Sequence, residues 1–258
     1  MTSRPRVRTL FATVGLAAAL AVTATPVAAD LPSKVKAALA DESRPAKDAE
    51  RDRNRQPLKT LEFFQLSEDM RVLELMPGGG WYTRILAPVM KESGKLYVAV
   101  GTTRIEESLL TQPGFEEVEV VTMKGDFNRA EGARRFDISN MALDVKEIDL
   151  ALTFRNLHNI TEAGRNQMNR AVYKALKPGG LYGVIDHTRR HMGEDTSESW
   201  RRLDPVAVIK EVQAAGFELV DFSDVHHRPD DELIYEVGRR SVTGNTDRFT
   251  LLFRKPKS

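Results

Sequence analysis

The sequence predicts an α/β protein with a mostly parallel sheet and helices on both faces. From Met70 onward, apolar strand-like segments alternate with helical ones, which is the pattern of consecutive βα units. Residues 148–153 are almost continuously apolar, as expected for a central parallel strand that is buried on both faces. The stretch VLELMPGGGWYT, residues 72–83, has the order of a buried strand, three glycines and a helix start. Such a turn lets a ligand approach bare backbone.

The first 29 residues are typical of a secretory signal peptide. Three arginines within the first eight residues precede an uncharged apolar stretch, residues 9–24, and small residues stand at Val27 and Ala29. This pattern predicts cleavage between Ala29 and Asp30 and export to the periplasm. An uncleaved membrane anchor is the alternative, but the apolar stretch is shorter than the roughly 20 residues that span a bilayer.

Charge and cysteine content limit the partners of the exported chain. Removing residues 1–29 takes away three arginines and no acid, so the formal charge changes from +1 to −2. A nearly neutral chain does not suggest nucleic acid or an anionic membrane surface as a partner. No second hydrophobic span is seen in the sequence, so we expect no stable membrane span after cleavage. The chain has no cysteine, which excludes disulfides and a lipoprotein anchor. We expect a small-molecule substrate instead.

A helical segment, residues 31–65, is expected before the first strand. Ser43 and Pro45 suit a helix start. One helix face then carries four charged side chains, Arg44, Asp48, Arg51 and Arg55. This face is either a solvated surface crossed by salt bridges or a charged cap that closes over a ligand.

The remaining elements follow in order along the chain. Strands are expected at residues 71–75, 95–100, 117–122, 148–153, 181–185, 217–221 and 248–254, and helices at 82–90, 161–176 and 205–215. Thr161 is the expected N-cap of its helix, the KPGG sequence at 177–180 ends that helix, and Gly216 ends the next. The last strand is expected to insert antiparallel.

Four segments of this series resemble class I S-adenosylmethionine-dependent methyltransferases, and the resemblance covers roughly residues 61–255. They are VLELMPGGG at 72–80, GDF at 125–127, DLALTFRNLH at 149–158 and LKPGG at 176–180. The glycine spacing differs from the dinucleotide fingerprint G-x-G-x-x-G. The chain looks in particular like a group of predicted exported methyltransferases with the same PGGGW loop. The resemblance implies a Rossmann-like, seven-stranded domain at 61–258 behind a helical cap at 30–60.

The resemblance also implies S-adenosylmethionine as cofactor and assigns residues to hold it. The expected cofactor-binding residues are Glu74, Gly78, Gly79, Gly80, Trp81, Asp126, Phe127 and Arg155. Glu74 would meet the cationic amino end of the cofactor, or else pair with an arginine of the cap. The glycines would admit the ligand or form a plain tight turn, and Trp81 and Tyr82 would line the pocket or pack beneath the loop. Asp126 would accept from the adenine amino group or cap a turn.

Three further residues are expected at the reacting end, since the carboxyl ends of parallel strands bind ligands in such sheets. They are His158, Asn156 and His187. His158 would be a general base, or would make a structural hydrogen bond. The polar segment from Arg189 to Trp200 would be a substrate lid or an exposed loop. His226 and His227 lack a third ligand at suitable spacing, so no metal site is predicted.

The chain departs from the family pattern at two positions. Met76 stands where the family usually has its first glycine, and Gly101 stands where an acid usually holds the ribose. The nearest acids to Gly101 are Glu106 and Glu107. The leading hypothesis is methyl transfer to an unidentified small-molecule or envelope substrate. The alternatives are a periplasmic small-ligand-binding protein without catalysis and a structural envelope protein.

Overall fold

A computed structural model describes residue 1 and residues 30–257. The predicted signal peptide, apart from residue 1, therefore lies outside the described residues, and its prediction stays open. Within the described part, no helix combines the length and the apolar character that a membrane crossing requires.

A seven-stranded sheet forms the centre of the molecule. Its strands are β1 (Arg71–Leu75), β2 (Lys95–Ala99), β3 (Glu119–Val120), β6 (Ile148–Phe154), β7 (Leu176–His187), β8 (Glu218–Ser223) and β9 (Arg248–Arg254). They lie in the order β3-β2-β1-β6-β7-β9-β8. All neighbours pair in parallel except β9, which inserts antiparallel between β7 and β8. The predicted fold class and the antiparallel last strand are both confirmed.

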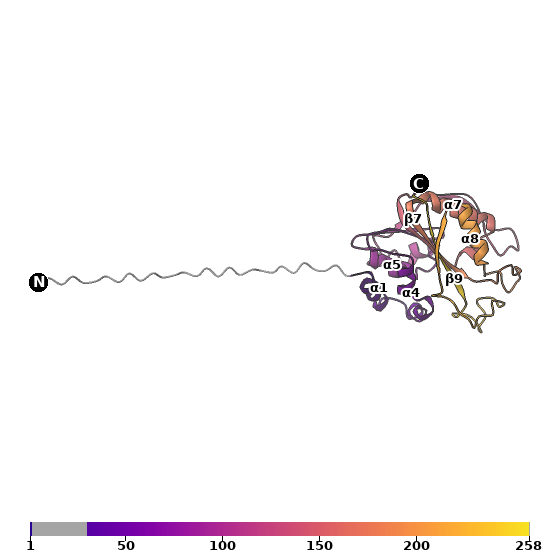
Figure 1. Cartoon of the computed structure of the whole chain (residues 1–258), viewed down its shortest axis with the longest axis horizontal. Coiled ribbons are helices and arrows are strands. Elements are labelled where there is room, and N and C mark those ends of the chain that lie inside the picture. Colours follow the sequence, from indigo (N-terminus) through magenta and orange to yellow (C-terminus); the bar gives the residue numbers. More distant parts are fainter. Residues whose placement is uncertain (2–29, 258) are drawn as a thin grey trace.

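Helices cover both faces of this sheet (Figure 1). On one face lie α1 (Leu31–Ala40), α4 (Pro57–Phe63) and α5 (Thr83–Met90), and on the other lie α7 (Glu162–Ala175) and α8 (Pro205–Ala214). Each face has its own core, because side chains alternate across a strand. Leu61 and Ile85 belong to one core, and Val172 and Val212 to the other.

The segment before β1 is helical as predicted, but it is broken into four pieces. Between α1 and α4 lie two single-turn helices, α2 (Ala46–Ala49) and α3 (Asp52–Arg55). Gln56 takes a left-handed conformation with φ of 42° and is followed by Pro57. The proline ring disfavours a right-handed helical conformation in the residue before it, so the chain turns at Gln56 and α4 begins at Pro57. The turn brings α2 and α3 beside the ends of the strands.

A hairpin between β3 and β6 was not predicted. It consists of β4 (Met123–Asn128) and β5 (Asp137–Leu143), which pair antiparallel as a separate two-stranded sheet. The residues of β4 are mostly exposed and polar, so the sequence gives little apolar alternation to reveal a strand. A short helix, α6 (Thr103–Ser108), follows β2 and was also missed. The predicted third strand shrinks to two residues.

Candidate functional site

A cavity of about 710 Å³ lies at the carboxyl ends of β1 and β6. The chain leaves β1 toward β2 and later returns to place β6 on the other side of β1, so the strand order reverses here. Open α/β sheets bind ligands at such a point. The lining comes from the cap, the glycine loop, α5, α6 and the end of β6: Pro45, Lys47, Asp48, Arg51, Arg55, Glu74, Met76, Pro77, Gly78, Gly79, Trp81, Tyr82, Arg84, Arg104, Glu107, Ser108, Phe154, Arg155 and Asn156.

The loop after β1 begins with a left-handed residue at the position of the expected glycine. Met76 has φ of 54°, a conformation that glycine adopts without strain. The Nδ2 group of Asn156 donates to the Met76 carbonyl at 2.8 Å and to the Phe154 carbonyl at 3.0 Å. Asn156, predicted to be catalytic, therefore lines the cavity and also ties the end of β6 to the glycine loop.

The three glycines have different surroundings. A Cβ added to Gly78 would meet nothing within 4 Å, and one added to Gly79 would meet only the Arg104 guanidinium, at 3.6 Å or more. Both residues therefore leave backbone open to the cavity. A Cβ on Gly80 would collide with the side chain of Leu109, and Gly80 is not part of the lining. The third glycine thus serves close packing of the loop on α6.

Glu74 is buried at the end of β1 and lines the cavity, with 2% of its surface exposed. Its Oε2 accepts from the Thr83 hydroxyl at 2.7 Å. Burial raises the pKa of Glu74 to about 7, although the Thr83 hydrogen bond and the charge of Arg55 act in the opposite direction. No described cation lies within 4 Å of this carboxylate, so it can receive a cationic group of a ligand.

Aromatic side chains form the wall next to Glu74. The ring of Tyr82 stacks on Phe154 with centroids 3.5 Å apart, and Trp81 meets Tyr82 edge-on. Trp81 Nε1 donates to the Asp48 carbonyl at 2.9 Å. The guanidinium of Arg55 lies 4.2 Å from the Trp81 ring centroid. Trp81 and Tyr82 therefore do both things considered from sequence, since they line the cavity and pack beneath the loop.

Three of the four side chains on the charged face of the cap are buried, and Arg51 is exposed. Arg44, Asp48 and Arg55 are buried, and Arg44 holds Asp52 through two hydrogen bonds of 2.8 and 2.9 Å. Asp48, Arg51 and Arg55 line the cavity. These side chains therefore form part of the cavity wall, and closure of the segment over a ligand stays a prediction.

Asp126 and Phe127 lie away from the cavity. They belong to β4, where Asp126 accepts from Asn140 at 3.1 Å and Phe127 is exposed. Neither residue is part of the lining, because the hairpin carries them outward. Gly101, which stands where the family usually has an acid, has a left-handed conformation with φ of 66°. Of the two acids that follow it, Glu107 lines the cavity and Glu106 does not.

His158 and His187 are close together but outside the cavity lining. Their ring centroids are 5.7 Å apart, and both are buried. His158 Nδ1 is 2.6 Å from Asp186 Oδ1. Because an ionised carboxylate only accepts, this contact selects the neutral tautomer with the proton on Nδ1 and the lone pair on Nε2, the orientation that a general base needs. Burial, helped by the charges of Arg248 and the other histidine, holds the pKa of His187 well below its usual value.

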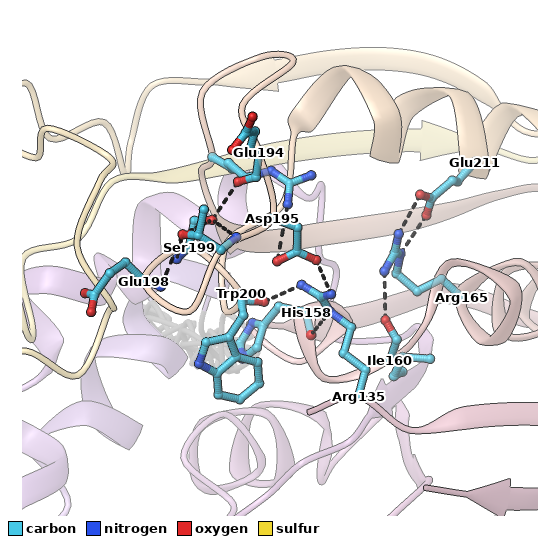
Figure 2. Close-up of polar contacts among 12 residues, drawn as sticks. Arg135, His158, Ile160, Arg165, Glu194, Asp195, Glu198, Ser199, Trp200 and Glu211 are labelled. Atoms are coloured by element: carbon cyan, nitrogen blue, oxygen red, sulfur yellow. Dashed lines mark hydrogen bonds and ion pairs between the residues drawn. The ribbon is translucent and has the colours of Figure 1, made fainter. Parts of the chain in front are cut away.

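The segment that follows β7 covers His158 (Figure 2). The indole of Trp200 meets the His158 ring edge-on, with centroids 6.4 Å apart. Arg135 holds this arrangement by donating to the carbonyls of His158 and Trp200 and pairing with Asp195. The segment lines a second cavity of about 520 Å³ together with Arg135 and Arg165, and it does not line the first. Its role as a substrate lid stays a prediction.

His226 and His227 make structural contacts. His226 lies between the Arg55 carbonyl, 2.9 Å from Nε2, and the Thr250 hydroxyl, 2.7 Å from Nδ1. His227 pairs with Asp247 at 3.0 Å. Within residues 30–257, no group of three His, Asp or Glu side chains is arranged to hold a metal ion.

Several lining residues were not proposed from sequence. They are cationic or polar side chains of α2, α5 and α6: Lys47, Arg84, Arg104 and Ser108. Their only sequence signal is proximity to the glycine loop or to the end of the second strand. Such proximity does not tell which residues of a helix face the cavity.

The fold is found among solved structures, although no family profile and no curated protein matches the chain. An S-adenosylmethionine-dependent methyltransferase from Aquifex aeolicus is 19% identical with a TM-score of 0.55, over 87% of this chain and 98% of that one. The [4+2]-cyclase SpnF is 17% identical with a TM-score of 0.55, over 84% and 85%. Human N-acetylserotonin methyltransferase is 16% identical with a TM-score of 0.51, over 87% and 56%. The chain therefore has the Rossmann-like fold of class I methyltransferases.

Proposed function

We propose that this protein transfers a methyl group from S-adenosylmethionine to a small-molecule or envelope substrate after export to the periplasm. The observation that carries the proposal is the cavity at the strand-order reversal, which combines the buried carboxylate of Glu74 with the open backbone of Gly78 and Gly79. The activity named for the Aquifex aeolicus structure agrees with it. Export rests on the signal sequence alone.

The residues of the cavity fit the proposed cofactor. Glu74 would face its amino group, and the Gly78 and Gly79 backbone would lie against its amino-acid end. Gly101 has no side chain to bind the ribose hydroxyls. Glu107, which lines the cavity, is the carboxylate that would bind them instead. When bound, S-adenosylmethionine supplies an electrophilic methyl group on a sulfonium sulfur.

Methyl transfer forms a bond from the nucleophile to the methyl carbon, breaks the bond from that carbon to sulfur and yields S-adenosylhomocysteine. The protein contributes mainly by positioning the reactants and excluding water. A nucleophile that carries a proton must release it, and His158 Nε2 is the group proposed to accept it. Since His158 lies outside the cavity lining, this role requires a rearrangement that brings Nε2 to the cavity.

Calorimetric titration with S-adenosylmethionine and S-adenosylhomocysteine tests the proposal. We expect binding of both, and we expect Gly79→Asp to abolish it by placing a side chain and a negative charge in the loop. Glu62→Gln, on an exposed position of α4, is the control and should bind normally. If neither compound releases or absorbs heat, at protein concentrations that detect a Kd of about 100 μM, the proposal is rejected.

A non-catalytic ligand-binding protein is the second candidate. It is favoured by the position of His158 and His187 outside the cavity, and the fold does not by itself imply methyl transfer, since SpnF is a cyclase. His158→Ala should spare binding in both cases. It lowers turnover only if His158 acts as a base.

A further inference from the structure

Three arginines from distant parts of the chain meet at the β6 side of the cavity. Arg55 comes from α3, Arg155 follows β6, and Arg248 begins β9. They line a small void behind Tyr82 and Phe154, and Arg55 and Arg155 also line the main cavity. A group bound at this end of the cavity would therefore lie against two guanidinium groups with a third directly behind them.

The three guanidinium groups have few partners for their charge. Arg55 and Arg248 are 7% and 4% exposed, and the Nε atom of each of the three arginines is buried without a hydrogen-bond partner among the described residues. Arg248 Nη1 donates to the Asn54 carbonyl at 2.9 Å. No carboxylate of residues 30–257 lies within 4 Å of any of the three. Buried charges are usually paired, so this arrangement is costly by itself.

Electrostatics points to the same cost. Burial, followed by the charge of Arg155, lowers the pKa of Arg55 to about 8 and that of Arg248 to about 9. Burial, followed by the charge of Arg51, also lowers the pKa of Arg155, and Tyr82 and Asp186 oppose that shift only in part. A guanidinium keeps its proton under ordinary conditions, so these shifts express the cost of desolvation and, after it, of mutual repulsion, and a bound anion would lower both.

The rest of the lining does not supply that anion. Six lining residues are Lys or Arg and three are Asp or Glu. Of the three acids, Asp48 lies 3.8 Å from Arg84 and 3.9 Å from Arg51, so it is already shared between two other cations. The carboxylate of a bound methyl donor carries one negative charge, which compensates only one of the three guanidinium groups.

We propose that the Arg55, Arg155 and Arg248 cluster binds a doubly charged oxyanion group, such as a phosphate, on the methyl acceptor. The substrate class is then an anionic small molecule whose nucleophile lies next to the end of β6. This inference rests on the proposed methyl transfer for the identity of the ligand, but the oxyanion site itself does not depend on it.

Inorganic phosphate, titrated into the purified protein at constant ionic strength set with chloride, tests the site. We expect a Kd on the order of 1 mM, because a free ion lacks the rest of the substrate. Arg155→Gln should weaken binding by about tenfold or more, since it removes charge-assisted hydrogen bonds. Arg248→Gln should weaken it less, since Arg248 lies behind the other two and contributes its charge alone. Arg254→Gln, at the other end of β9, is the matched control and should bind phosphate as the unaltered protein does.

Arg155→Gln also guards against loss of folding. It removes a repelled cation whose Nε has no partner, so its melting temperature without phosphate should not fall below that of the unaltered protein. Absence of phosphate binding, or equal weakening in Arg254→Gln, would overturn the site.

Competition distinguishes the acceptor from the donor as the source of the anion. Simultaneous binding of phosphate and S-adenosylhomocysteine supports the acceptor. Competition of phosphate with S-adenosylhomocysteine but not with methylthioadenosine, which lacks the carboxylate, would assign the cluster to the donor and overturn the inference. Phosphate binding without any binding of S-adenosylhomocysteine would reject methyl transfer and leave the oxyanion site standing.

Discussion

At the scale of single residues, Glu74 combines burial with a place on the cavity wall. Its neutral form is favoured by burial, while a cationic ligand group favours the charged form. The same carboxyl group therefore links ligand binding to pH, and a small change in its surroundings decides whether it is charged near neutrality.

The affinity for S-adenosylmethionine should rise between about pH 6 and pH 8, as Glu74 ionises around its pKa of about 7. Calorimetry across this range measures it. Glu74→Gln should bind weakly with little pH dependence. An unchanged affinity in this variant would exclude Glu74 from the site.

Glu74 should also make the unfolding free energy depend on pH. Its folded pKa lies above the ordinary value of 4.5, so the folded state binds the proton more tightly and stability falls as pH rises from about 4.5 to 7. The loss is about 3 kcal/mol at most. Urea unfolding should show this decrease in the unaltered protein relative to Glu74→Gln, which lacks the titrating group.

Gly80 and Gly101 provide a matched pair for the role of left-handed backbone. Both have positive φ, but an added Cβ collides with Leu109 at Gly80 and meets nothing within 4 Å at Gly101. Gly80→Ala should cost about 2–4 kcal/mol of unfolding free energy, and Gly101→Ala about 1 kcal/mol. Equal losses in urea unfolding would show that close packing at Gly80 contributes nothing.

At the scale of elements, His226 fastens the cap to the sheet. Its Nε2 donates to the Arg55 carbonyl at the end of α3, and its Nδ1 accepts from Thr250 on β9. This single imidazole joins segments that are nearly 200 residues apart. It thereby fixes the cap residues that line the cavity.

Acid should weaken this connection. Burial lowers the pKa of His226 from 6.5 to about 4, so the unfolded chain takes up a proton that the folded state refuses, and stability falls as pH drops from about 6.5 to 4. The contribution is about 3 kcal/mol at most. His226→Gln, which keeps donor and acceptor atoms but does not titrate, should lose less stability in urea unfolding over this range.

At the scale of the whole molecule, the sheet brings the cap, the glycine loop and the arginine cluster to one edge. The β4–β5 hairpin lies outside that edge in the described structure. Ligand binding should therefore stabilise the cap and the glycine loop locally, and it should leave the hairpin unchanged.

S-adenosylhomocysteine at about 100 times its Kd should raise the unfolding free energy by about 2.7 kcal/mol. Amide hydrogen exchange should slow locally in residues 45–56 and 76–82, and it should not slow locally in the hairpin. Protection of the hairpin instead would place the adenine near Asp126, as the resemblance implied, and would contradict the cavity as the binding site.

The sequence by itself determined the order of the strands of the main sheet, the larger helices and the glycine turn. These features follow from local periodicity and from glycine and proline chemistry, which act over a few residues. The β4–β5 hairpin could not be predicted in this way, because its strands are largely polar and pair only with each other.

Only the tertiary structure decided which charged side chains meet. Arg55, Arg155 and Arg248 are about 100 residues apart from one to the next, and nothing in the sequence indicates that they meet. Their convergence depends on the crossing from β3 to β6 and on the insertion of β9, which no local pattern encodes. The same long-range packing placed Glu74 in the cavity, kept His158 and His187 outside its lining and carried Asp126 outward, because contacts between distant segments are set by the fold as a whole.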